Sequence, residues 1–306
     1  SPQLVVLTYH RILPHSDPRY DEEQPGMVVE PDTLRMHLRV AKQYFEPMAL
    51  QDWLDRAAAG RPLPPKAFAV TFDDGWRDNF DYGFKALQAE EVPATVFLVS
   101  DMVGTDQTFW PERLSKTVLW VCGQGSPEAW SLRQFRWLTE LGVLDRFDGS
   151  RPSRDQLDEI VTLSKRFGDS ELHRWIDAMQ AAVGMDKTAA ELDIVDWEQL
   201  AAMRDSGLVT YGSHTRRHVR LIPGLDRATM EDEIVISKAR IEARMGSPVE
   251  LFCYPNGDIQ PQAEALVRQH YRGALTTCTG WHRLGEDPFR IRRIAYHQVI
   301  ANDEPA

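Results

Sequence analysis

Short apolar runs that alternate with longer amphipathic runs constrain the fold of this 306-residue chain most strongly. Apolar runs rich in β-branched and aromatic residues predict strands, and the amphipathic runs predict helices. The predicted strands lie near residues 4–9, 67–72, 94–99, 207–212, 249–254, 272–277 and 290–296. The predicted helices include 31–44, 77–90, 196–206, 226–245 and 260–270, of which two carry a proline suited to the first turn, Pro31 and Pro261. This alternation indicates an α/β fold built on a parallel sheet or barrel.

Residues 101–195 interrupt the alternation. They hold five of the nine tryptophans and have a helical pattern almost throughout, with polar breaks at 123–127 and 148–154. We therefore expect one domain over residues 1–306 with a helical insertion at about 101–195. Helical spacing predicts a place in the core for four of the tryptophans, namely Trp120, Trp130, Trp137 and Trp175.

Composition excludes several classes of protein. The net charge of −11 disfavours a nucleic-acid partner, because surfaces that follow phosphates are basic. No run of eighteen apolar residues is present, so we expect no membrane span and no signal peptide within this chain. The three cysteines form no even framework or closely spaced pair, so we expect no disulfide. The chain begins with Ser1 rather than methionine, and a cytoplasmic location and export after removal of an upstream segment are both compatible with it.

Two polar motifs directly follow predicted strands, TFDDG at 71–75 and HTRRH at 214–218. Neither is specific alone, since Asp-Asp-Gly after a strand is typical of a turn and histidine pairs are common on helices. Strand ends of one parallel sheet or barrel are where enzymes collect their sites, and the two motifs together predict a metal site there. If 214–218 form one helical turn, both imidazoles lie on the same face. Two histidines and one aspartate leave a further position open for water or substrate.

At these motifs the chain resembles the polysaccharide deacetylases of carbohydrate esterase family 4, also called the NodB homology domain. The family's first motif, TFDDG, is unaltered, and His214 to His218 match the second. FCYPNGD at 252–258 and VLTYHRI at 6–12 resemble segments of the branch that deacetylates exported poly-N-acetylglucosamine. The resemblance implies an irregular, incomplete (β/α)7 barrel. It also implies a metal-dependent hydrolase that removes N-acetyl or related acyl groups from the amino sugars of a polysaccharide.

The resemblance assigns roles to residues of the motifs. Asp73 would be the general base, and one divalent ion would be held by Asp74, His214 and His218. The ion would be zinc in the first place, with cobalt or nickel as alternatives. Asn256 falls where the family has a tyrosine that donates its backbone N–H to the oxyanion, a role that tolerates a change of side chain.

Two further positions are less closely defined. His10 matches the histidine that acts as general acid in the poly-N-acetylglucosamine branch, and His282 and His297 compete for the role. The arginine that orients the base in many members is replaced by Cys253. Either Arg77 or Arg292 orients Asp73 instead, or the base is held less tightly.

Three other functions are compatible with parts of this pattern. An O-acetyl glycan esterase would use the same machinery. A non-catalytic glycan-binding module would keep the fold, but the intact Asp73 argues against it. A purely structural metal site is disfavoured by the open ligand position. The expected partner is an N-acetylated glycan, for which Phe109 and Trp110, before Pro111 in an expected loop, are candidate contacts.

Overall fold

The structure is a computed structural model that describes residues 1–124, 127–142, 151–185 and 193–298. Contacts divide the chain into two compact units. The barrel unit comprises Ser1–Pro14, Gly26–Gln107 and Leu192–Ala306, and the helical unit comprises His15–Pro25 and Thr108–Glu191.

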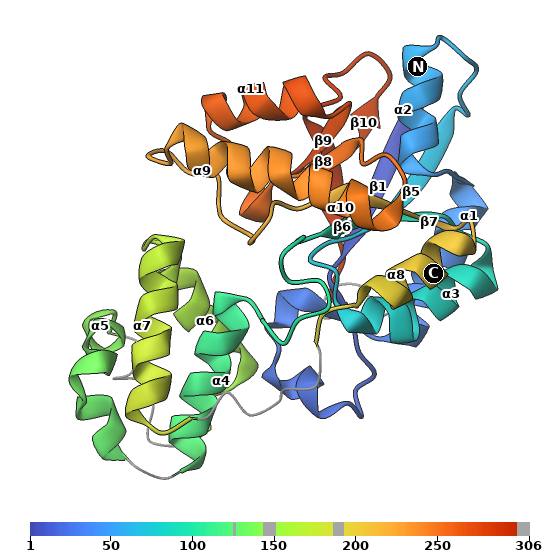
Figure 1. Ribbon diagram of the computed structural model, residues 1–306. Helices are drawn as coiled ribbons and strands as arrows, with labels where there is room; N and C mark the ends of the chain where they lie inside the picture. Colours follow the sequence, from blue (N-terminus) through green and yellow to red (C-terminus); the bar gives the residue numbers. More distant parts are fainter. Residues whose placement is uncertain (125–126, 143–150, 186–192, 299–306) are drawn as a thin grey trace. The chain divides into compact units, whose positions relative to one another are not determined.

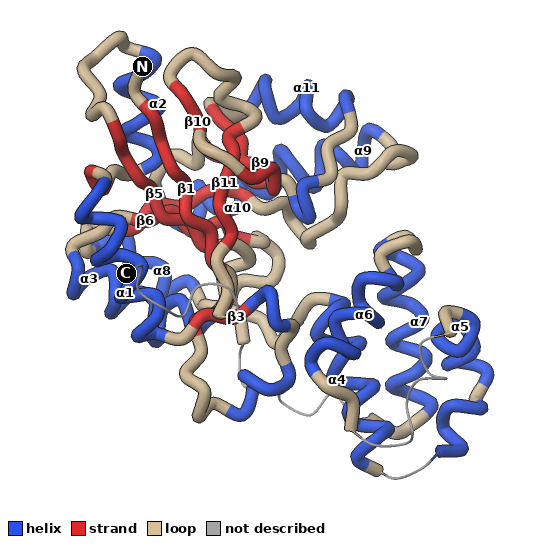
Figure 2. The backbone as a smooth tube through the Cα atoms, turned by 180° about the vertical axis from the view of Figure 1, so that it is seen from behind, coloured by secondary structure: helices blue, strands red, loops and turns tan. Residues whose placement is uncertain are grey.

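The barrel unit is built on seven parallel strands (Figure 2). They are β1 (Gln3–Tyr9), β5 (Lys66–Phe72), β6 (Ala94–Leu98), β7 (Val209–Ser213), β8 (Leu251–Cys253), β9 (Gly273–Thr279) and β11 (Ile291–Ala295). Each strand pairs with the next in the order β1-β5-β6-β7-β8-β9-β11, and β11 pairs again with β1 to close the ring. All seven predicted strands are therefore present, and the α/β barrel of the (β/α)7 type is confirmed.

Four shorter strands have no counterpart in the prediction. β4 (Glu46–Pro47) extends the sheet parallel to β5, and β10 (His282–Arg283) lies antiparallel to β1. β2 (Arg11–Ile12) and β3 (Val28–Val29) form a separate pair. Each has only two residues, which is too short to produce a periodic pattern in the sequence.

Seven α-helices accompany the strands in the described barrel unit (Figure 1). They are α1 (Pro31–Tyr44), α2 (Leu50–Ala58), α3 (Phe84–Glu90), α8 (Trp197–Asp205), α9 (Arg227–Glu231), α10 (Ser237–Met245) and α11 (Pro261–His270). Pro31 and Pro261 stand in first turns as predicted, because a missing N–H costs nothing there. Two π-helical turns adjoin them, η3 (Asn79–Gly83) before α3 and η7 (Asp232–Ile236) between α9 and α10. α1, α3 and α8 gather on one side of the strands, and α9 and α11 lie beside β8 and β9.

The helical unit contains α4 (Trp110–Gly123), α5 (Arg136–Glu140), α6 (Arg154–Ser164) and α7 (Asp169–Ala182). Short 3₁₀ turns stand at η1 (Pro18–Glu22), η4 (Pro127–Ser131) and η5 (Arg133–Phe135). η2 (Pro25–Met27) spans the boundary between the units, and η8 (Pro255–Gly257) belongs to the barrel unit. The single domain with an insertion at 101–195 stays a prediction, and 125–126, 143–150 and 186–192 lie outside the described residues.

The helical unit has an apolar core of its own. Trp130, Trp137 and Trp175 pack against this core, as predicted. Trp120 is 39% exposed, so its predicted place in the core was wrong. Phe109 and Trp110 are only 4% and 5% exposed, so they are not available as glycan contacts. They were misassigned because Pro111 opens α4 and does not belong to a loop.

Two expectations from composition can be compared with the structure. Cys122, Cys253 and Cys278 all have free thiols, as predicted. None of the helices in the described part of the chain has the length and apolar run needed to cross a bilayer.

Candidate active site

The two adjacent aspartates stand where β5 ends. The Asp73 N–H donates to the Tyr9 carbonyl at 3.0 Å, which ties this end of β5 to β1. Asp74 and Gly75 then take left-handed φ angles of 75° and 76°. A Cβ on Gly75 would also lie 3.0 Å from Leu98 Cδ2, so glycine suits the turn on both counts. The turn ends the strand, as predicted, and allows the two carboxylates to take different partners.

The Asp74 carboxylate faces two imidazoles. Trp76 Nε1 donates to Asp74 Oδ2 at 3.0 Å. Oδ1 lies 3.5 Å from His214 Nε2 and 3.4 Å from His218 Nε2. One carboxylate oxygen is thus fixed by the indole, and the other is directed at the histidines.

His214 follows β7 and is 3% exposed. Its Nδ1 lies 2.8 Å from the Cys253 carbonyl, which can only accept, so Nδ1 carries the proton and Nε2 has its lone pair directed at Asp74. Burial lowers the pKa of His214 to about 4. The imidazole is therefore neutral near pH 7, the form that can bind a metal.

The segment 214–218 is not the predicted helical turn. Thr215 and His218 have left-handed φ angles of 67° and 61°, so the chain makes a loop in which the two imidazoles still meet, 4.9 Å apart between ring centroids. Buried Glu233 in η7 accepts the backbone N–H groups of Arg216 and Arg217 at 3.0 and 2.8 Å. The Glu233 carboxylate thus satisfies two backbone N–H groups of this loop, which therefore need no helical hydrogen bonds.

These residues fit one divalent ion. One ligand atom each from Asp74, His214 and His218 lies within 4.8 Å of the other two. In a tetrahedral site with bonds near 2.1 Å, ligand atoms stand about 3.4 Å apart. The Oδ1–Nε2 distances of 3.4 and 3.5 Å agree with that spacing. The ligand set does not select one metal among zinc, cobalt and nickel.

A second group, Asp73, His214 and Cys253, also meets the distance criterion. Burial raises the pKa of the Cys253 thiol, which keeps it in the protonated form that metals bind poorly. Both Asp73 oxygens already accept hydrogen bonds from Arg293. The group with Asp74 is the better candidate.

Arg293 is the partner of Asp73 that sequence reasoning missed. From β11 its Nη1 and Nη2 donate to Asp73 Oδ1 and Oδ2 at 2.8 and 2.9 Å. Burial alone would raise the pKa of Asp73, but the adjacent guanidinium outweighs it and holds the pKa well below its usual range. Asp73 is therefore ionised, and Cys253 Sγ lies 3.6 Å from the same carboxylate.

The prediction that Arg77 or Arg292 orients Asp73 was wrong. Arg77 lies 3.5 Å from Asp81, and exposed Arg292 borders a hollow elsewhere on the barrel. Strand alternation in the sequence does not choose between Arg292 and Arg293, because Ile291 has the parity of Arg293 and Ile294 has the parity of Arg292. In the structure Ile291 and Arg293 are buried, whereas Arg292 is exposed.

His10 comes closest to Asp73 among the candidate acids. Its Nε2 lies 3.8 Å from Asp73 Oδ2, and its side chain is 26% exposed. His282 pairs with Leu4 near the start of β1, about 16 Å along the strand from Tyr9 at ~3.3 Å per residue. His282 is therefore not near Asp73. His297 follows β11 at the same end of the barrel as His10, since Tyr296 N–H donates to the Thr8 carbonyl.

Asn256 occupies a sharp turn after β8. Its φ is 55°, and its side-chain amide donates to Asp258 Oδ2 at 3.0 Å. Gly257 follows with φ 76°, and a Cβ there would lie 2.0 Å from Thr277 Oγ1. Cys253, three residues before Asn256, contacts both Asp73 and His214, so the turn adjoins the same cluster.

The sequence profile of the family described as "polysaccharide deacetylase" matches residues 60–121 and 160–272, more than half of the chain. This chain belongs to the polysaccharide deacetylase family. Membership confirms the enzyme class expected from the sequence, a hydrolase of the polysaccharide deacetylase type. Among curated protein sequences, none matches this deacetylase significantly.

Solved structures share the fold of this deacetylase. The Streptococcus pyogenes deacetylase PplD, in complex with acetate, superposes with a TM-score of 0.61 at 15% identity, covering 97% of this chain and 94% of PplD. IcaB from Ammonifex degensii has a TM-score of 0.60 at 20% identity, with coverages of 97% and 92%. A de-N-acetylase from Aggregatibacter actinomycetemcomitans has a TM-score of 0.60 at 17% identity, with coverages of 96% and 95%.

Proposed function

We propose that this chain removes N-acetyl groups from the amino sugars of a polysaccharide, with Asp73 as general base and His10 as general acid. One observation carries the proposal. An ionised buried carboxylate, Asp73, contacts a partly exposed histidine and lies beside the cluster of Asp74, His214 and His218. The residues proposed as base, acid and metal ligands thus lie together at one end of the barrel, which supports amide hydrolysis.

Asp74, His214 and His218 would hold the ion, zinc in the first place. A bound divalent ion would polarise the acetyl carbonyl and make water more acidic. The Trp76 hydrogen bond to Asp74 and the Cys253 carbonyl at His214 Nδ1 fix the orientation of two of the three ligands. The site therefore needs little rearrangement to accept the ion.

The proton transfers fall to Asp73 and His10. Asp73, kept ionised by Arg293, takes the proton from the attacking water. His10 then gives a proton to the departing amine, for which its partial exposure toward solvent is suitable. The left-handed turn at Asn256 offers a backbone N–H to the developing oxyanion.

Poly-N-acetylglucosamine is the substrate that the motifs favour. The YHRI segment carries His10 and the YPNGD segment carries Asn256, and both resemble that branch of the family. IcaB and the Aggregatibacter de-N-acetylase share the fold of this chain. An esterase acting on O-acetylated glycans would use the same base, acid and ligand set, so the substrate test must include one.

The test is acetate release from four substrates, with and without a chelator: poly-N-acetylglucosamine, chitin oligomers, peptidoglycan fragments and acetylated xylan. We expect release from an N-acetylated glycan, loss of release with the chelator, and recovery when zinc is added. The Asp73→Asn variant is the matched control for contaminating activity. Acetate release from acetylated xylan alone would indicate an O-acetyl esterase instead of an N-deacetylase. Glycan binding without acetate release, whichever metal is added, would indicate a non-catalytic binding module.

A further inference from the structure

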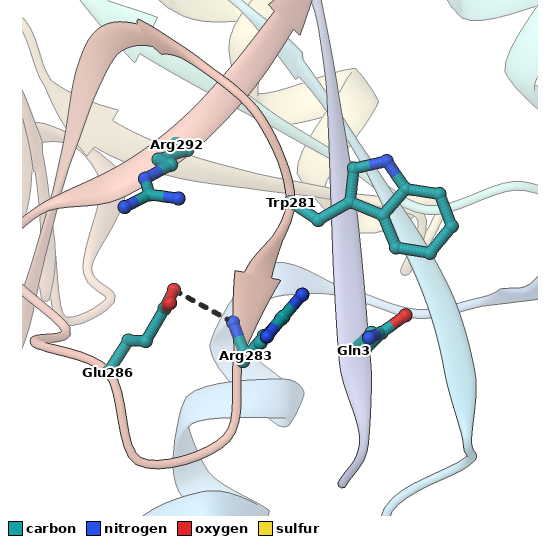
Figure 3. A pocket seen from close by; sticks show the side chains of 5 residues that line it. All are labelled: Gln3, Trp281, Arg283, Glu286 and Arg292. Atoms are coloured by element: carbon teal, nitrogen blue, oxygen red, sulfur yellow. Dashed lines mark hydrogen bonds between the residues drawn. The ribbon is translucent and has the colours of Figure 1, made fainter.

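A polar hollow lies at the end of the barrel opposite the proposed active site. Its volume is about 550 Å³, and its lining comprises Gln3, Trp281, Arg283, Glu286 and Arg292 (Figure 3). Gln3 begins β1, whereas Tyr9 ends it beside Asp73. Six residues of strand separate the two ends by about 20 Å at ~3.3 Å per residue. The hollow is therefore distinct from the cluster of Asp73 and the proposed ligands.

The hollow is basic although the chain is acidic. Arg283 and Arg292 are exposed, and in the described part of the chain neither guanidinium forms an ion pair. Glu286 is engaged by its own loop, since its Oε2 accepts the Arg283 backbone N–H at 3.1 Å and lies 3.6 Å from His282 Nδ1. The guanidiniums of Arg283 and Arg292 are thus available to bind an anionic ligand, although the net charge of the chain is −11.

An exposed indole adjoins these cations. Trp281 is 36% exposed, and its ring contacts Phe45 edge-on at 5.5 Å between centroids. In Figure 3, Trp281, Arg283 and Gln3 extend to one side of β10, and Arg292 lies on the other side together with Glu286. A ring held in place at the surface offers a flat apolar face to the C–H groups of a sugar. Guanidinium forks and a side-chain amide suit acidic groups and hydroxyls.

A second hollow of about 260 Å³ shares Arg283 and Glu286 with the first. Its other side is apolar, with Trp53 and Leu54 of α2 in its lining. His282 also lines it, is 3% exposed, and has its Nδ1 3.6 Å from Glu286 Oε2. The second hollow thus combines an apolar wall with the loop that holds Glu286 and Arg283.

We propose that these two adjoining hollows, here named the β10 site, bind an anionic saccharide. The sugar ring packs on Trp281, and its acidic group binds the guanidiniums of Arg283 and Arg292. The shared chemistry is a sugar that carries a carboxylate or a phosphate. Because this site lies at the other end of the barrel from Asp73, it would attach the enzyme to an acidic glycan without occupying the active site.

The test measures affinity of the whole chain by calorimetry at low salt for three probes: an oligogalacturonate, a mannose-6-phosphate oligosaccharide and neutral maltohexaose. We expect the wild type to bind one or both charged probes with Kd below about 1 mM and the neutral probe at least about tenfold more weakly. The double variant Arg283→Gln/Arg292→Gln and Trp281→Ala should each lose about tenfold or more in affinity. Carboxylate or phosphate selectivity would identify which acid the site takes.

Two controls separate this proposal from the proposed function. Arg227→Gln changes an exposed arginine on α9, ion-paired to Glu231 at 2.7 Å, and should leave binding unchanged. Asp73→Asn should bind the charged probes as the wild type does, whether or not the enzyme is a deacetylase. Equal binding of the neutral probe, no binding of either charged probe, or unchanged affinity in the double variant would each overturn the β10 site.

Discussion

The guanidinium of Arg293 donates to both carboxylate oxygens of Asp73, at 2.8 and 2.9 Å, across 220 positions of sequence. The position where the family resemblance implies an arginine holds Cys253, whose Sγ lies 3.6 Å from the same carboxylate. The positive charge beside Asp73 is thus supplied by β11 instead of β8. A planar fork restricts the orientation of a carboxylate more than a single ammonium would.

Removing this guanidinium should impair both stability and activity. Arg293→Met leaves Asp73 buried and unpaired, so we expect a loss of about 3–5 kcal/mol in the free energy of unfolding, measured by urea denaturation. In the proposed reaction kcat should fall about 10²-fold, because the base is no longer oriented. Arg293→Lys should recover part of the stability and less of kcat. Arg227→Met, at an exposed position on α9, is the control, and an Arg293→Met variant as active as this control would refute the positioning role.

Asp73→Asn should distinguish a role of Asp73 as general base from a role as metal ligand. We expect acetate release to fall about 10²–10⁴-fold, because the amide cannot accept the proton from water. Metal content after dialysis should stay near that of the wild type, since Asp74 and the two histidines supply the proposed ligands. A variant that loses its metal together with its activity would show that Asp73 is itself a ligand.

The strand pattern of this fold could be predicted because of burial. Strands of a parallel barrel are covered on both faces, so β1, β5 and β6 are nearly continuous apolar runs. Their directly following polar residues then identify the end of the barrel where Asp73 and His214 lie. β10 has two residues and no such pattern, and its position beside β1 depends on tertiary contacts.

Only those parts of the candidate site that lie within short sequence motifs could be predicted. A spacing of four suggested a helical turn at His214 to His218, but two left-handed φ angles and the Glu233 carboxylate produce a loop instead. Backbone dihedrals of this kind are not encoded in residue spacing. The pairing of Arg293 with Asp73 is a long-range contact, and strand alternation does not favour Arg293 over Arg292, because Ile291 and Ile294 have opposite parity.

Replacing either proposed histidine ligand should empty the metal site. In His214→Ala and in His218→Ala we expect the metal content, measured after dialysis against a weak chelator, to fall well below that of the wild type, because two ligands hold a divalent ion poorly. His270→Ala, at an exposed position on α11, is the matched control and should keep the metal. Full metal content in both ligand variants would place the ion elsewhere.

His10→Ala should change the pH profile of acetate release. Without the proposed acid, kcat falls and the alkaline limb of the profile disappears, because that limb reports loss of the proton needed by the leaving amine. His297→Ala should retain the limb. The reverse result would transfer the role to His297, which lies at the same end of the barrel.

Glu90 at the end of α3 should make stability depend on acid pH. Its carboxylate accepts from Arg35 at 2.7 Å and Arg39 at 2.9 Å, and these arginines lower its pKa. A lowered pKa in the folded state stabilises the protein above the pKa of the unfolded carboxyl, near 4.3, and the contribution is lost as pH falls through the folded-state pKa. Because both arginines are about half exposed, we expect Glu90→Gln to cost about 1 kcal/mol at pH 7 and less at pH 3. Urea denaturation at both pH values measures this cost, and Glu91→Gln, at an exposed position, is the control. A cost that does not depend on pH would mean that Glu90 acts through packing and not through charge.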